Sequence, residues 1–116
     1  MLVVLFRSRL TEAAGADYES MNDELEETAR NAPGFVDMKS YSADDGERLT
    51  VVRWKDPETL KQWREVARHR EAQRIGRERW YQWYRIEVAE LVRDSSFSRK
   101  AGPAAGDETL GERHAE

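Results

Sequence analysis

The chain contains no cysteine and only two histidines among its 116 residues. The absence of thiols excludes disulfide bonds and thiolate metal sites. One histidine, His114, lies close to the C-terminus, which leaves His69 as the single imidazole in the main part of the chain. A lone imidazole without acids at ligand spacing makes a poor metal site, so we expect no bound metal.

Long apolar runs are also missing. The longest, at residues 1–6, falls far short of the about 20 apolar residues that a membrane-spanning helix needs. It precedes the first charges, whereas a secretory signal carries its positive charges first. We therefore interpret the run as a strand and expect a soluble cytoplasmic protein with no membrane partner.

An excess of basic residues is absent too, because the net charge is -4. A nucleic-acid-binding surface normally needs unopposed basic side chains, so we expect no nucleic-acid partner. The charges are unevenly spread: residues 12–30 hold seven acids and one base, while residues 61–79 hold seven bases and three acids. This asymmetry favours self-association between unlike faces, or an anionic ligand near the basic segment.

Residues 101–116 contain a single leucine, no aromatic residue and four acids against one arginine. Such a segment cannot bury enough apolar surface to offset the entropy lost on ordering. We expect a mobile acidic C-terminal tail here and one folded domain over residues 1–100. A domain of that size gains core readily by pairing with a second copy.

Hydrophobic spacing predicts six elements in this domain. Asp45-Gly46 is typical of a hairpin turn, and Asp56-Pro57 is typical of a helix start. The predicted elements are a strand in residues 1–10, a helix over about 15–31, strands over 35–43 and 49–54, a helix from 57 to 76 with a bend near His69, and a last strand from Tyr84. The order β-α-β-β-α-β predicts a ferredoxin-like α+β fold, an antiparallel sheet with helices on one side.

The other face of this sheet has no cover within one chain. The apolar side chains that we place on it are Val3, Leu5, Val36, Met38, Val52 and Leu91. A second copy stacked sheet to sheet would remove them from water. We therefore expect a homodimer.

Trp63 is the first candidate for a ligand site. It lies between Leu60 and Ala67 on the apolar side of the second helix. A core tryptophan is the more common occupant of such a position. The alternative is a cavity wall whose indole N–H holds a ligand oxygen.

His69, Gln73 and Arg77 follow one another at intervals of four residues, so on a continuous helix they share a face. An imidazole, an amide and a guanidinium in a row suit an acid or a phenolate. A solvated helix face is the alternative interpretation. Trp80 comes next, in a run of bulky aromatic residues interleaved with arginines, a composition that favours an interface over nucleic-acid stacking.

These features together resemble the antibiotic biosynthesis monooxygenase (ABM) domain family. The resemblance covers nearly all of residues 1–100 and lies in the element order, the Pro33-Gly34-Phe35 break, Trp54 at a strand end, and Trp63. The pattern HxxAQxxGRxxWYxxY, which runs from His69 to Tyr84, is similar to that of an uncharacterised bacterial subgroup. The resemblance implies a dimeric α/β barrel in which two four-stranded sheets face one another and each subunit keeps a ligand cavity between helices and sheet.

The family includes enzymes that oxidise polycyclic phenols with O₂ and need no metal or flavin, and others that bind and degrade heme. Several members have no known reaction. The heme-degrading branch uses an asparagine, a tryptophan and an iron-binding histidine, which correspond by position to Ser8, Trp63 and Gln73 here. Because the iron ligand is missing, the resemblance disfavours heme degradation and implies no cofactor. Ser8 alternates with the apolar residues of the first strand, which places it on the helix-facing side.

Two functional classes stay open. In the first, the protein is a cofactor-independent monooxygenase that acts on a small aromatic or phenolic compound with O₂. His69 removes the phenolic proton, Arg77 stabilises the phenolate and Trp63 forms the cavity wall. In the second, the same cavity holds a small ligand without turnover, as a binding or stress-related module. The further residues expected at the ligand are Ser8, Gln73 and Trp80.

Overall fold

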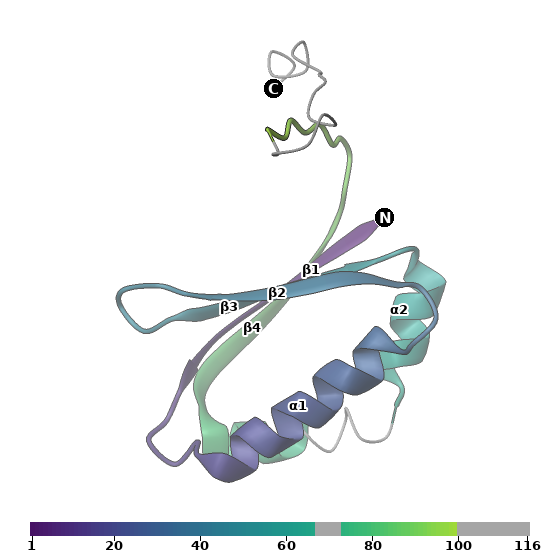
Figure 1. Ribbon diagram of the computed structural model, residues 1–116. Coiled ribbons are helices and arrows are strands. Elements are labelled where there is room, and N and C mark those ends of the chain that lie inside the picture. Colours follow the sequence, from purple (N-terminus) through teal and green to yellow (C-terminus); the bar gives the residue numbers. More distant parts are fainter. Residues whose placement is uncertain (67–72, 100–116) are drawn as a thin grey trace.

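The computed structural model of the chain describes residues 1–66 and 73–99. Its elements, in chain order, are β1 (Leu2–Leu10), α1 (Ala16–Arg30), β2 (Phe35–Ser42), β3 (Arg48–Trp54), α2 (Pro57–Arg64), the π-helical turn η1 (Gly76–Trp80) and β4 (Tyr81–Glu90). The strands form an antiparallel sheet in the order β2-β3-β1-β4, and α1 and α2 lie on the same side of it (Figure 1). The predicted ferredoxin-like α+β fold is confirmed. The predicted tail and the predicted bend near His69 lie outside the described residues.

Among the helices in the described ranges, none has the length and apolar character to cross a membrane.

The junction between α1 and α2 depends on one glycine. Gly34 follows α1 with a φ of 84°, a left-handed conformation that other residues rarely adopt. Its carbonyl accepts a hydrogen bond from the Lys55 backbone N–H at 2.7 Å, and a Cβ at this position would overlap the side chain of Thr59. The chain after α1 therefore lies directly against the first turn of α2.

Helix α2 begins where the sequence predicted. The Asp56 carboxylate accepts a hydrogen bond from the Thr59 backbone N–H at 2.9 Å, and Pro57 occupies the first helical position. The hydrogen bond from the Thr59 backbone, followed by that from its hydroxyl, lowers the pKa of Asp56. The carboxylate thus stays charged and caps the helix at neutral pH.

Side chains alternate between the two faces of the sheet. Facing the helices, Val4 of β1 lies between Val52 of β3 and Val88 of β4. The odd-numbered residues of β1, among them Val3 and Leu5, consequently point to the other face, as predicted. We call this second side the outer face.

The prediction for the outer face is wrong at Met38 and Val52. Both pack against the core on the helix side, and Val52 stands directly opposite Val4. In β2 the register shifts next to Val36, which forms a bulge and reverses the alternation of the residues before and after it. In β3 the outward residue is Val51, one position away from the predicted one.

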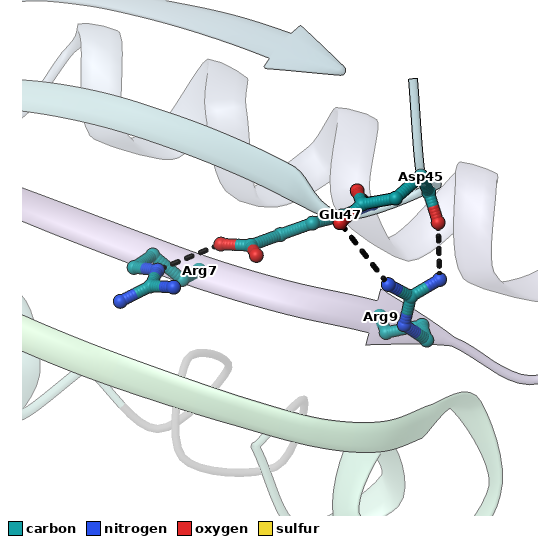
Figure 2. Close-up of polar contacts among 4 residues, drawn as sticks. All are labelled: Arg7, Arg9, Asp45 and Glu47. Atoms are coloured by element: carbon teal, nitrogen blue, oxygen red, sulfur yellow. Dashed lines mark hydrogen bonds and ion pairs between the residues drawn. The ribbon is translucent and has the colours of Figure 1, made fainter. Parts of the chain in front are cut away.

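Charged pairs cross the outer face near the β2–β3 turn (Figure 2). Arg7 Nε donates to Glu47 Oε2 at 2.7 Å, and Arg9 Nη1 donates to the Asp45 backbone carbonyl at 2.6 Å. Arg9 Nη2 also lies 3.8 Å from the Asp45 carboxylate. These contacts join the turn to the central strand β1.

Strand β4 starts earlier than predicted, at Tyr81 rather than Tyr84. Tyr81 pairs with Leu10 after a register shift that leaves Gln82 of β4 without a partner in β1, so the aromatic run itself enters the sheet. The strand ends at Glu90, and Val92 beyond it is 93% exposed. Aromatic residues such as Tyr81 favour strands. The helical spacing of the segment before Tyr81 had led us to place the start of the strand too late.

The best-buried part of the core lies under α2. It centres on Ala29, Trp54 and Leu60, and the ring of Trp54 contacts two others. Phe35 meets it edge-on with ring centroids 5.8 Å apart, and Trp63 stacks on it at 5.9 Å with an interplanar angle of 25°. This packing fixes the position of Trp63 relative to the sheet.

Candidate functional site

A cavity of about 620 Å³ lies between the helices and the helix-facing side of the sheet. Its volume falls within the range of about 300–1,000 Å³ that is typical of small-molecule sites. Four residues of α1 that recur at intervals of three and four line it: Tyr18, Met21, Leu25 and Ala29. The cavity is therefore walled by α1 on one side and by β1, β3 and β4 on the other.

One end of the cavity is built from aromatic rings, and we call it the aromatic end. The rings of Tyr18 and Trp80 meet edge-on with centroids 5.4 Å apart, and those of Tyr81 and Tyr84 also lie 5.4 Å apart. Phe6 is 5.6 Å from both Tyr81 and Tyr84. Edge-to-face pairs of this kind contribute about 0.5–1.5 kcal/mol each beyond their buried area, so this end is rigid.

Gly76 allows the aromatic end to close. A Cβ at this buried position would lie 2.5 Å from the ring of Tyr81, so any larger residue would displace that ring. The Tyr81 backbone N–H donates to the Gly76 carbonyl across the π-helical turn, which brings the two residues together. The GRxxWY part of the sequence pattern thus has a structural cause.

Trp80 is held in place by Asp17 at the start of α1. Its indole N–H donates to the Asp17 carboxylate at 3.3 Å, and Arg79 forms an ion pair with the same oxygen at 2.9 Å. Desolvation opposes the charged form of Asp17, but the hydrogen bonds from Trp80 and from the Tyr18 backbone, with the charge of Arg79, outweigh it and lower the pKa of Asp17. The Trp80 N–H is therefore engaged within the protein, while its ring faces the cavity.

Tyr81 is a neutral group at the aromatic end. Burial, followed by the neighbouring Tyr18, raises the pKa of Tyr81 well above its ordinary value. Its hydroxyl therefore stays protonated in the physiological range and cannot act there as a base.

Tyr84 connects the cavity wall to the surface of η1. Arg77 Nη1 donates to the Tyr84 hydroxyl at 3.0 Å, although Arg77 itself is exposed and is not part of the wall. Gln73 lines the cavity and Arg77 does not, so the two side chains do not form the predicted row along one ligand.

The opposite end of the cavity carries the predicted tryptophan. Trp63 lines it together with Trp54 and Leu60. Trp63 is thus both stacked on the core and part of the cavity wall, while the hydrogen bond from its indole N–H to a ligand oxygen stays a prediction.

Polar groups on facing helical segments also line the cavity, and none of them was among the predicted site residues. Asn22 Nδ2 donates to Glu26 Oε2 at 3.2 Å on α1, and Arg64 lies in the wall formed by α2. Asn22 and Glu26 follow Tyr18 at intervals of four residues, which places all three on one side of the helix. This spacing could have indicated that the two polar residues face the cavity, but the apolar residues beside them follow the same helical periodicity.

The predicted site residues have different outcomes. Trp63, Gln73 and Trp80 line the cavity, as expected. Ser8 is only 2% exposed and shares the helix-facing side of β1 with Phe6, but it is not part of the wall. Its partners on the adjacent strands are Arg48 and Tyr84. His69 lies outside the described residues.

Within residues 1–66 and 73–99, no group of three or more histidine, cysteine, aspartate or glutamate side chains is arranged to hold a metal ion.

The fold agrees with the comparison to known families. The model of the antibiotic biosynthesis monooxygenase family matches residues 1–75. The chain belongs to the ABM family. An uncharacterised relative, YqjZ of Bacillus subtilis, is 30% identical over 80 residues, which cover 69% of this chain and 70% of the relative.

Solved structures share the ABM fold of this chain at low identity. A protein titled as a putative antibiotic biosynthesis monooxygenase from Deinococcus radiodurans has a TM-score of 0.73 and 10% identity, and covers 84% of this chain and 99% of its own. Rv0793 of Mycobacterium tuberculosis has a TM-score of 0.71 and 17% identity, with coverages of 82% and 98%. At these identities the likeness concerns the fold alone.

Proposed function

We propose that this ABM domain is a cofactor-independent monooxygenase whose substrate is a small phenolic compound bound in the cavity. The observation that carries the proposal is the cavity itself, about 620 Å³ in volume, with tyrosine and tryptophan rings at both ends. Flat aromatic walls suit a flat aromatic ligand, and polar side chains between the ends can orient it.

The proposed reaction needs only the phenol and O₂. A base removes the phenolic proton, and the electron-rich phenolate transfers one electron to O₂. The resulting carbon radical and superoxide combine into a peroxide, which loses water to leave a quinone. Overall, one phenol and one O₂ give one quinone and one water: one oxygen atom enters the ring and the other leaves with two substrate hydrogens. We assign the role of base to His69, the only imidazole within residues 1–100.

Oxygen uptake against a panel of one-, two- and three-ring phenols tests the proposal. Uptake is expected without added metal or flavin and in the presence of a chelator, with one quinone formed per O₂ consumed. The rate is expected to fall in His69→Ala, because the variant lacks the base. Trp63→Phe keeps most of the apolar volume and tests whether the indole ring is needed in the cavity wall. Saturable binding of the phenols without any uptake would contradict the oxygenase and favour the binding module.

We also propose that two copies pair through their outer faces. Leu49 and Val51 of β3 lie on this face beside Val3 and Leu5 of β1. Residues 91–99 leave β4 on the side of the sheet away from the helices (Figure 1), and they carry exposed apolar side chains of their own. A second copy on this side would bury both sets.

Light scattering at micromolar concentration is expected to give twice the chain mass of 13.5 kDa. Val51→Lys places a charge in the centre of the outer face and is expected to shift the protein toward the monomer. Ser20→Lys, on the exposed side of α1, is the matched control and leaves the mass unchanged. A wild-type monomer under these conditions would argue against the pairing.

A further inference from the structure

Tyr84 occupies a special place in the cavity wall. It lies on the helix-facing side of β4, opposite Ser8 of β1, and its ring is held by Phe6 and Tyr81. It is half-buried, so its ring belongs to the wall while its hydroxyl reaches the boundary between the cavity and η1. Packing on both sides of the ring leaves the hydroxyl in a fixed position.

The direction of the Arg77–Tyr84 hydrogen bond decides what this hydroxyl can do. A guanidinium has N–H donors and no acceptor. The Tyr84 oxygen, 3.0 Å from Arg77 Nη1, must therefore accept, which directs its own O–H elsewhere. Within the described ranges, the structure shows no hydrogen bond from that O–H to a protein acceptor.

Arg77 brings a positive charge that carboxylates do not neutralise. The arginines beside it are paired: Arg74 lies 3.5 Å from Glu78 and Arg79 lies 2.9 Å from Asp17. For Arg77, the described part of the chain offers no carboxylate within ion-pair distance, and its contact is the Tyr84 oxygen. A donor that itself receives a charge-assisted hydrogen bond forms a stronger bond to an anionic acceptor.

We infer that the Tyr84 hydroxyl is the group that binds the oxygen of a phenolic ligand in the cavity, and that Arg77 is its positioning residue. This inference rests on the proposed function and deepens it, because it fixes the end of the cavity at which the ligand oxygen lies. The ring of the ligand then extends along the cavity toward Trp63, and its oxygen receives the Tyr84 proton in a hydrogen bond that tightens as the phenol becomes a phenolate. A cationic group is disfavoured at this end, because it would face the guanidinium across one oxygen atom.

The test uses 4-nitrophenol as the probe, because its phenolate form absorbs visible light and reports both its affinity and its pKa when bound. Tyr84→Phe keeps the ring packing and removes the hydroxyl. It is expected to weaken binding of the phenolate about 10- to 100-fold, the usual loss of a hydrogen bond to a charged group. The pKa of the bound probe is expected to rise by about one to two for the same reason.

Arg77→Gln is expected to give a smaller loss, about 3- to 10-fold, and a smaller rise in the pKa of the bound probe. Because Arg77 acts through Tyr84, the double variant is expected to bind no more weakly than Tyr84→Phe alone, so the two changes are not additive. Tyr41→Phe and Arg74→Gln remove an exposed tyrosine and an exposed arginine outside the wall, and are expected to leave both readouts unchanged.

The outcomes separate the inference from the proposed function. If the wild-type protein binds the probe and Tyr84→Phe binds it equally, with an unchanged bound pKa, the inference is overturned while the phenol cavity stands. Additive losses in the double variant would remove the positioning role of Arg77. If the wild type binds no phenol at all, the proposed function fails and the inference falls with it. Circular dichroism of each variant confirms that the fold is retained, and Arg77→Gln, which changes only a surface side chain, keeps the test decisive if Tyr84→Phe does not fold.

Discussion

Gly34→Ala is expected to lower the free energy of unfolding by about 2–5 kcal/mol. Two costs add. Alanine at a φ of 84° suffers left-handed backbone strain of about 1–2 kcal/mol. Its Cβ would also overlap the Thr59 side chain at the first turn of α2, and overpacking of this kind costs about 1–3 kcal/mol.

Urea unfolding at fixed protein concentration measures this loss, because any pairing of subunits would otherwise change the apparent stability. Gly15→Ala is the matched control. Gly15 has a φ of -127° and no atom within 4 Å of the position of a Cβ, so its replacement is expected to change stability by less than about 1 kcal/mol. Equal urea midpoints for Gly34→Ala and Gly15→Ala would show that the Thr59 side chain moves away from the added methyl group without a loss of stability.

The second large effect concerns hemin. Wild-type protein is expected to give no Soret shift on mixing with hemin, because the cavity position that corresponds to the iron ligand of the heme-degrading relatives is Gln73, whose amide is a weak iron ligand. Gln73→His places an imidazole in the wall that also contains Trp63. It is expected to tighten hemin binding from about millimolar or weaker to about micromolar, a gain of roughly 4 kcal/mol.

Arg74→His is the control for this prediction. It adds the same imidazole one residue further along, at an exposed position that is not part of the cavity wall. Titration of hemin followed at the Soret band is expected to show binding by Gln73→His and none by Arg74→His. A tight wild-type complex that disappears in His69→Ala would reverse the assignment and make the protein a heme binder.

The parts of the fold that could be predicted from sequence are those encoded locally. The boundaries of α1 follow from apolar spacing and the Pro33-Gly34 break, and the start of α2 follows from the Asp56 cap. The face of the sheet to which a residue points was predicted from strict alternation along each strand. A single bulge at Val36 breaks this alternation and turns Met38 to the opposite face from the predicted one. No local signal marks a bulge of this kind, because it is stabilised by pairing with β3.

The candidate site was predictable to a similar degree. Trp63 and Gln73 lie in the cavity because α-helical spacing holds through their segments. Arg77 does not line the cavity; it lies in the π-helical turn from Gly76 to Trp80, a turn that the sequence pattern did not indicate and in which Gly76 lies against Tyr81. The contact between Arg77 and Tyr84 spans a helix-to-strand junction, so neither helical nor strand periodicity indicates it.

The π-helical turn also acts as a spacer in front of β4. It holds one residue more than an α-turn would between the helix and Tyr81. A chain shortened by one residue within this turn could close it as an α-turn and still deliver Tyr81 opposite Leu10. The turn would thus absorb a one-residue deletion before the sheet begins. The side chains of Tyr84, Ile86 and Val88 would then keep facing the helices instead of the outer face.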